Sequence, residues 1–274
     1  MVAPNGARRT KTDHPALPLT AEELGATARA CHHAGAAAIH LHVRDAEARH
    51  SLDAAAYRAA MAAVQRDCPE IAIQTTTEAA GRFELAEQIA SVEALRPSCL
   101  SFSIAEMMRE GEARGEAFLV WAAAQNIGLQ FILYDTAQIA QLARLRDAGT
   151  LHLPGKPRII LVAGRYSSTQ DSDLAEFEAL YDALRASGLD SQSLWMTCAF
   201  GRGEMACLER TIELGGHVRV GFENAIVDSA GRPARDNAER VAMVADLARK
   251  HGRALASPAE AALVLDRRLP GLFA

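Results

Sequence analysis

Cysteine is scarce in this chain, and both long apolar runs and a leader-like start are missing. Its five cysteines form no Cys-x-x-Cys pair and no regular disulfide spacing, and their number is odd; this pattern is typical of a reducing compartment. No stretch approaches the roughly 18 consecutive apolar residues that a membrane-spanning helix needs. Residues 1–6 lack the basic segment and apolar core of a signal peptide. We therefore expect a soluble, cytoplasmic protein with no membrane partner.

The chain also lacks an excess of positive charge and has few lysines. Its net charge is −5 and residues of both signs are interspersed, so there is no basic stripe for a nucleic-acid backbone, and we expect no nucleic-acid partner. The only lysines are Lys11, Lys156 and Lys250. Lys156 precedes a predicted strand, which is the wrong end for the Schiff-base lysine of a barrel aldolase. The sequence thus argues against that class of enzyme.

What the chain does have is a regular alternation of short apolar runs and longer amphipathic stretches. Its 274 residues, 49% of them hydrophobic, can bury a large core. The predicted strands are 2–4, 37–43, 71–76, 99–103, 129–134, 158–163, 193–199 and 217–221. The predicted helices are 20–34, 53–66, 83–95, 115–126, 136–147, 171–187, 204–214 and 234–251. Eight βα units close most simply into an α/β TIM (β/α)8 barrel, with a doubly wound open sheet as the alternative. We expect one barrel domain over residues 1–274 with a short helical extension at 257–269.

The most informative motif is His40-Leu41-His42 near the end of the second predicted strand. Side chains at i and i+2 of a strand project to the same side, so two imidazoles so placed can converge on one metal ion. Taken alone, the pair is equally compatible with two packed imidazoles. Catalytic Zn²⁺ usually takes three protein ligands, and the best third candidate is Glu223, which follows the eighth predicted strand. Barrel closure would bring that strand close to the second.

Further polar residues follow the predicted strands at the carboxyl ends, where barrel enzymes hold their chemistry. They are Thr76, Ser101, Asp135, Arg219 and Asn224. Three of them also have a purely structural interpretation. Thr76 would be an ordinary β-branched strand residue, Asp135 a helix cap, and Arg219 one half of an ion pair with Asp45 or Glu78.

Four motifs together resemble one known family. They are Asn5-Gly6-Ala7, His40-Leu41-His42-Val43-Arg44-Asp45, Phe200-Gly201-Arg202-Gly203 and the stretch from Gly215 to Glu223. They are similar to those of the β-keto acid cleavage enzymes. The resemblance implies a homotetrameric TIM barrel with one Zn²⁺ per subunit, held by His40, His42 and Glu223. It also implies a reaction in which a β-keto acid and acetyl-CoA yield acetoacetate and a new acyl-CoA.

The reaction that the resemblance implies needs groups that this chain can supply. The substrate's keto and carboxylate oxygens would be chelated by the metal, and an enolate-type nucleophile would attack the thioester before retro-Claisen cleavage. Arg219 would help to stabilise the enolate charge, and the Thr76 hydroxyl would reach the thioester carbonyl or the substrate carboxylate. Two imidazoles and a carboxylate suit Zn²⁺ but also accommodate Fe²⁺, Co²⁺ or Mn²⁺. The chain has no phosphate-binding loop for CoA, which leaves scattered arginines such as Arg165 and Arg202.

The chain departs from the family pattern at two positions. Asn224 stands where the family has the Asp assigned to substrate deprotonation, and an amide cannot accept a proton at neutral pH. Glu78 is the nearest substitute base, unless it only opens the next helix, and Asp135 is the second candidate. Arg8 stands where the lysine-pathway member has an acidic residue that receives the substrate amine. We therefore predict a β-keto acid with an anionic or polar distal end.

We place Asn5 and Ser101 with Arg8 and Asp135 among the substrate-binding candidates. Two other functions stay open at this point. One is a zinc hydrolase of a small amide or lactone, because such enzymes also use a His-x-His pair in a barrel. The other is a metal-dependent binder that has lost turnover through the change to Asn224.

Overall fold

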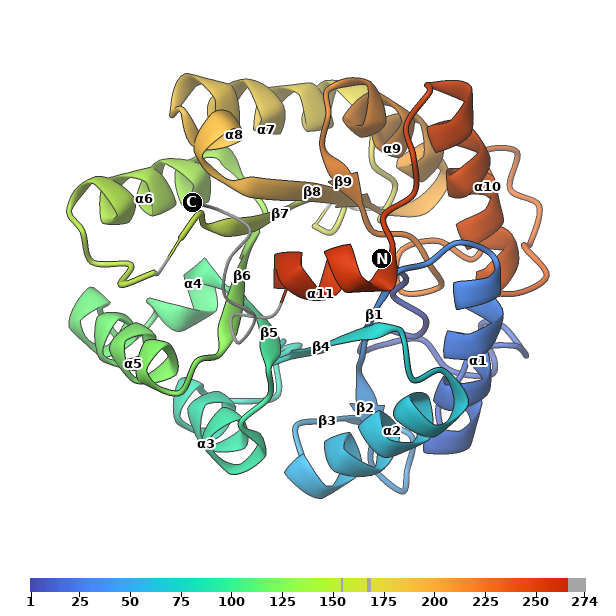
Figure 1. The fold of residues 1–274 in the computed structure, drawn as a ribbon, viewed down its shortest axis with the longest axis horizontal. Helices are drawn as coiled ribbons and strands as arrows, with labels where there is room; N and C mark the ends of the chain where they lie inside the picture. The colour runs from blue at the N-terminus through green and yellow to red at the C-terminus, as the bar shows by residue number, and fades with distance from the viewer. Residues whose placement is uncertain (154, 167–168, 266–274) are drawn as a thin grey trace.

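The computed structural model describes residues 1–153, 155–166 and 169–265, and its centre is a parallel sheet (Figure 1). The seven strands lie side by side in the order in which they occur along the chain. They are β1 (Ala38–His40), β4 (Ala72–Thr76), β5 (Cys99–Ser103), β6 (Gly128–Leu133), β7 (Arg158–Ala163), β8 (Leu194–Ala199) and β9 (His217–Val218). The sheet is curled and helices surround it, so the predicted TIM-barrel class is confirmed.

The N-terminal segment joins the two edges of this sheet. Val2 forms parallel bridges to Ile39 beside β1 and to Val220 just beyond β9. The Val2 amide donates to the Ala38 carbonyl at 2.8 Å, and the Ala3 amide donates to the Val220 carbonyl at 2.8 Å. The predicted strand 2–4 is therefore only a bridging residue, because Pro4 has no N–H with which to extend the ladder. Its backbone hydrogen bonds nevertheless connect the β1 edge of the sheet to the β9 edge and so close the barrel.

Helices follow the strands and pack around the outside of the sheet (Figure 1). The longer ones are α1 (Ala21–His33), α2 (Ala54–Asp67), α3 (Leu85–Leu95), α5 (Glu112–Ala124), α6 (Thr136–Asp147), α7 (Leu174–Ala186), α9 (Glu204–Glu213) and α10 (Asn237–Lys250). Side-chain caps mark where two of them begin: Thr20 forms a capping box with Glu23 at the start of α1. Asp173 caps α7, so α7 begins at Leu174 and not at the predicted residue 171. None of the described helices is both long and apolar enough to cross a membrane.

Three short helices and a hairpin were absent from the prediction. The helices are α4 (Ile104–Met107), α8 (Leu189–Gln192) and η1 (Gly201–Gly203). The hairpin pairs β2 (Val43–Arg44) with β3 (His50–Ser51) in antiparallel fashion. The predicted strand 37–43 therefore ends at His40. The Asp45 carboxylate accepts from the amides of Glu47 and Arg49 and so closes the hairpin turn.

A C-terminal helix, α11 (Pro258–Leu265), lies across one end of the barrel (Figure 1). Leu265 and Ala261 pack against Ala38, Ala72 and Cys99, which are the first residues of β1, β4 and β5. The covered end is therefore the amino end of the strands. The start of the predicted extension 257–269 is observed, while residues 266–269 lie outside the described residues.

Barrel closure yields a stability prediction at Gly221, whose φ is +143°. A Cβ there would meet the carbonyl group of Ala3, with the carbon at 2.8 Å. Gly221→Ala should therefore destabilise the protein by about 4 kcal/mol, because it strains the backbone and displaces the N-terminal segment that closes the barrel. The measurement is urea unfolding. The control Gly231→Ala also has a positive φ but open space around the new Cβ, and it should cost only about 1–2 kcal/mol. Equal losses in both variants would contradict the prediction.

Candidate metal centre and active site

Three predicted side chains meet at the carboxyl end of the barrel. His40 is the last residue of β1, His42 lies two residues further on, and Glu223 follows β9. One ligand atom from each lies within 4.8 Å of the others. The two imidazole Nε2 atoms are 3.2 Å apart, and Glu223 Oε2 lies 3.6 Å from that of His40 and 3.4 Å from that of His42. Two nitrogen donors and one carboxylate oxygen thus face a common point.

The N-terminal segment positions both sides of this cluster. The His40 amide donates to the Val2 carbonyl at 2.8 Å, and the Glu223 amide donates to the Ala3 carbonyl at 3.0 Å. Further along, the Asn5 side-chain amide donates to the His42 carbonyl at 3.1 Å. Gly6 has a φ of +61°, and a Cβ at this position would lie 2.5 Å from Glu223 Cγ. Glycine is therefore needed for the segment to pass beside the carboxylate.

A buried amide chain fixes the tautomer of His40. Its Nδ1 lies 2.8 Å from Gln74 Oε1, and Gln74 Nε2 in turn donates to Gln130 Oε1 at 3.0 Å. With its amide so oriented, Gln74 offers an acceptor, so Nδ1 carries the proton and Nε2 keeps its lone pair. Burial, reinforced by the positive charge of Arg219, lowers the pKa of His40 to about 3. The ring is thus neutral and ready to act as a ligand.

Glu223 is held as a carboxylate by its neighbours. Burial raises its pKa, but the guanidinium of Arg219, followed by the His42 side chain, outweighs burial and holds the pKa well below its usual range. Arg219 Nη2 donates to Glu223 Oε1 at 2.8 Å. The other oxygen, Oε2, is buried and accepts no hydrogen bond from any described residue. A buried carboxylate oxygen without a donor, facing two imidazoles, suits the binding of a cation.

A second carboxylate, Glu78, lies on the other side of His42. Its Oε2 is 3.7 Å from His42 Nε2, and its Oε1 accepts from Arg165 Nη2 at 2.7 Å. Burial and the charge of Glu223 raise the pKa of Glu78, but the imidazole of His42 and the guanidinium of Arg165 bring it below the ordinary value. Glu78 therefore points into the site and does not simply open the next helix.

Of the other predicted residues, the structure brings some to this cluster and leaves others outside it. A small cavity lies beside His40, Glu78 and Glu223, and Thr76 also lines it. The Thr76 hydroxyl oxygen accepts from the Glu78 amide at 3.2 Å. Asn5 and the exposed Arg8 line an adjoining pocket that also reaches Glu78 and Glu223. Ser101 is buried beside Thr76 in the β4–β5 pair and lines neither space.

Asp135 and Asn224 are placed differently from what was expected. Asp135 is exposed and caps α6, accepting from the Gln138 amide at 2.8 Å, which is the structural alternative weighed above. Asn224 is fully buried, and neither atom of its side-chain amide has a hydrogen-bond partner among the described residues. It lines neither the cavity nor the adjoining pocket. Its hydrogen bonds run through its backbone: the carbonyl accepts from Arg9 and from the Gly201 amide, and the amide donates to the Gly221 carbonyl at 2.8 Å.

Sequence reasoning missed the supporting residues. Gln74 and Tyr134 were not selected, yet Gln74 orients His40 and Tyr134 lines the cavity. A polar Gln in an otherwise apolar strand was the available signal for Gln74. Arg165 and Arg202, considered for CoA phosphates, are engaged by carboxylates: Arg165 by Glu78 and Arg202 by Asp171 at 3.1 Å.

Comparison with known proteins agrees with this geometry. The sequence profile described as beta-keto acid cleavage enzyme matches residues 1–266. The chain belongs to this family. The resemblance inferred from the four motifs is confirmed, and the chain is accordingly an enzyme of the class that acts on β-keto acids and acetyl-CoA.

Relatives match this chain over nearly its whole length. A 3-keto-5-aminohexanoate cleavage enzyme of Fusobacterium nucleatum is 28% identical over 267 residues, covering 95% of this chain and 94% of the relative. A 3-oxoadipate:acetyl-CoA acetyltransferase of Cupriavidus necator is 27% identical over 271 residues, covering 96% and 93%. The two act on different β-keto acids, so family membership alone leaves the substrate undecided.

Solved structures support the fold. The apo structure of ObcA superposes with a TM-score of 0.71 at 18% identity, covering 92% of this chain but only 65% of the longer ObcA chain. A phospho-2-dehydro-3-deoxyheptonate aldolase of Thermotoga maritima superposes with a TM-score of 0.57 at 11% identity. The match covers 97% of this chain and 70% of the aldolase chain. At these identities the likeness concerns the barrel alone.

Proposed function

We propose that this chain is a zinc-dependent enzyme that condenses a β-keto acid with acetyl-CoA and releases acetoacetate and a new acyl-CoA. The observation that carries the proposal is the convergence of His40, His42 and Glu223, with Glu223 Oε2 lacking a donor, in a barrel of this family. The donor set suits Zn²⁺. When bound, the ion would supply a Lewis acid that withdraws electron density from the keto oxygen. The family resemblance also favours a cytoplasmic homotetramer.

Arg219 would provide the fixed positive charge of the site. Its side chain is 6% exposed and already donates to Glu223. Burial opposes its charge, but the neighbouring Cys198 and Glu223 raise the pKa of Arg219 above the usual value. The guanidinium therefore stays protonated and can stabilise negative charge on a substrate oxygen as the α-proton is removed.

Glu78 is our proposed base in place of the family's Asp. It is ionised, lies beside His42 and lines the cavity, whereas Asn224 has no basic atom and lines neither the cavity nor the adjoining pocket. The α-carbon proton of the substrate would pass to Glu78, with Arg165 holding the other carboxylate oxygen. The Thr76 oxygen accepts from the Glu78 amide, so the hydroxyl proton is free to reach a thioester carbonyl or a substrate carboxylate.

Arg8 would select the distal end of the substrate. It is exposed at the adjoining pocket and forms no ion pair with any described residue. Its neighbour Arg9 is instead engaged with the backbone carbonyls of Phe222 and Asn224. A free guanidinium favours a carboxylate and disfavours an ammonium group. The Cupriavidus relative, whose name specifies 3-oxoadipate, is consistent with a substrate that carries a second carboxylate.

The substrate assignment predicts a clear preference. With acetyl-CoA present, kcat/KM should be higher for 3-oxoadipate than for 5-amino-3-oxohexanoate, and Arg8→Glu should shift the ratio of the two by roughly tenfold towards the amine. Steady-state assays of acetoacetate release measure both. Lys156→Glu makes the same reversal of charge before β7, at the amino end of the barrel, and should not change the ratio. A wild-type preference for the amine would overturn the assignment.

The same assay separates the alternative functions. Product release without any acyl-CoA would identify a hydrolase. Absence of product with every thioester, despite ligand binding, would identify a binder.

The base assignment predicts the effect of Glu78→Gln. Removing the proton acceptor should lower kcat by about 10²–10⁴-fold while leaving the bound metal in place, and Glu78→Asp should retain part of the rate. Steady-state kinetics and elemental analysis of the same samples are the measurements. Glu93→Gln, on the exposed side of α3, is the control. An unchanged kcat in Glu78→Gln would remove Glu78 from this role.

The metal assignment predicts that Gln74→Leu weakens zinc binding by about 10–100-fold, because His40 loses the acceptor that fixes its tautomer. Competition with a zinc chelator gives the affinity. Gln125→Leu, at the C-terminal end of α5, should bind zinc like the wild type. Equal affinities for the wild type and Gln74→Leu would refute the proposed orientation of His40.

A further inference from the structure

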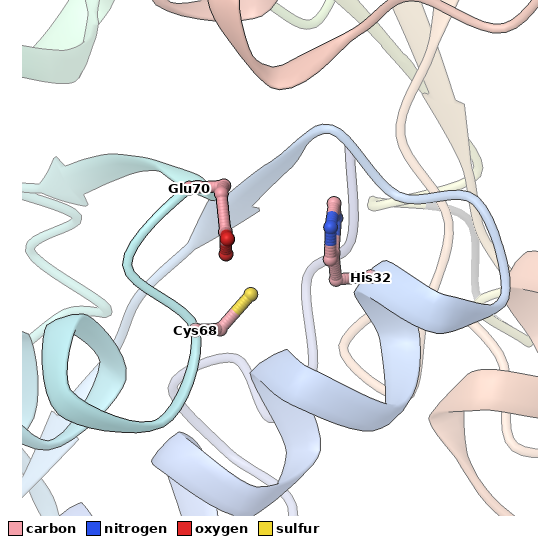
Figure 2. Close-up of side chains that lie close together, drawn as sticks. All are labelled: His32, Cys68 and Glu70. Atoms are coloured by element: carbon pink, nitrogen blue, oxygen red, sulfur yellow. The ribbon is translucent and has the colours of Figure 1, made fainter.

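A second group of metal-ligating side chains lies at the other end of the barrel. His32 is in the last turn of α1, Cys68 caps the C-terminus of α2, and Glu70 lies in the turn that leads into β4. One ligand atom of each lies within 4.8 Å of the others. Figure 2 shows the Cys68 sulfur and the Glu70 carboxylate extending from the turn towards the space beside the His32 ring. Nothing in the proposed reaction uses these residues.

A backbone hydrogen bond selects the tautomer of His32. Its Nδ1 lies 3.1 Å from the Ala36 carbonyl oxygen. A carbonyl only accepts hydrogen bonds, so Nδ1 carries the proton and Nε2 keeps its lone pair. A backbone carbonyl that orients an imidazole in this way is the usual second partner of a metal-binding histidine.

Cys68 and Glu70 supply two further donors held by a short turn. Cys68 is a free cysteine with 2% exposure. Its backbone amide donates to the Val64 carbonyl, and its backbone carbonyl accepts from the Ile71 amide. These two hydrogen bonds fix the backbone on both sides of Cys68. Glu70 is exposed and forms no ion pair with any residue that the structure describes. The cluster is therefore rigid on one side and reachable from solvent on the other.

We propose that His32, Cys68 and Glu70 form a second binding site for a divalent transition-metal ion, with Zn²⁺ as the best fit. One nitrogen, one sulfur and one oxygen donor suit Zn²⁺ or Co²⁺, whereas a thiolate is a poor ligand for Mg²⁺ or Ca²⁺. A water molecule would complete four-coordination. On binding, the Cys68 thiol loses its proton to solvent and the sulfur forms the bond to the metal.

The position of the site indicates a structural role. α1 leads into the amino end of β1, and the turn at Glu70 leads into the amino end of β4. Residues at this end of a barrel contribute to stability rather than to catalysis. A bound ion would connect the end of α1 to the α2–β4 turn, and it would stabilise the folded state because the unfolded chain does not hold the three donors together.

Cobalt titration of the metal-stripped, full-length protein tests the proposal. We expect two Co²⁺ per chain in the wild type, one of which gives a thiolate-to-cobalt charge-transfer absorption. His40 and His42 replaced together by Ala should leave one ion and the full absorption. Cys68→Ser should also leave one ion but abolish the absorption, without changing catalytic activity. Cys207→Ser replaces another buried thiol and should keep both ions.

Two further measurements guard against misfolding of Cys68→Ser. Glu70→Gln changes an exposed side chain, and it should weaken the second ion by roughly tenfold or more while leaving the fold intact. Added Zn²⁺ should raise the melting temperature of the His40→Ala/His42→Ala protein, and this increase should be smaller in the triple variant with Glu70→Gln. A single equivalent without charge-transfer absorption in the wild type would overturn the proposal. Weak binding that is unaffected by Cys68→Ser and Glu70→Gln would indicate an adventitious ion only, and would equally overturn it.

Discussion

The pairing of Val2 with Ile39 on one side and with Val220 on the other is the constraint on which the candidate metal site depends. β1 leads to the two imidazoles, and the carboxylate of Glu223 follows Val220. In an open sheet these would be the two outer edges. The short N-terminal segment joins them and goes on to contact both ligand-bearing loops. A few backbone hydrogen bonds at the start of the chain therefore position side chains that are about 180 residues apart in sequence.

Within this frame, each buried carboxylate has its own guanidinium. Glu223 is paired with Arg219 and Glu78 with Arg165. Two carboxylates on either side of His42 would repel each other if they were left unpaired, and burial would then favour their protonation. The arginines keep both ionised, so one can serve as a ligand and the other as a base. This division of roles depends on long-range pairing, because the Glu78–Arg165 contact spans 87 positions in the chain.

The sequence was sufficient for features that depend on local pattern. Strand and helix periodicity led to the barrel, and the His-x-His spacing with a polar strand end at Glu223 led to the cluster. Arg165 as the partner of Glu78 could not be predicted, because register and barrel curvature determine which strand ends meet. The hairpin after His40 was missed because its turn relies on Ala48 at a φ of +60°, which alanine does not signal. Asp135 illustrates a different difficulty, since a helix cap and a ligand at a strand end have the same sequence context.

Helix α11 covers the amino ends of β1, β4 and β5, while the cavity beside Glu223 lies at the carboxyl end. Ile160, Met196 and Cys198 belong to an apolar cluster that fills the barrel interior, so under the proposed function both substrates would reach the cavity from the carboxyl side. Helix α11 thereby makes the two faces of the barrel unequal: one is covered by the chain itself, and the other holds the cavity beside the candidate ligands.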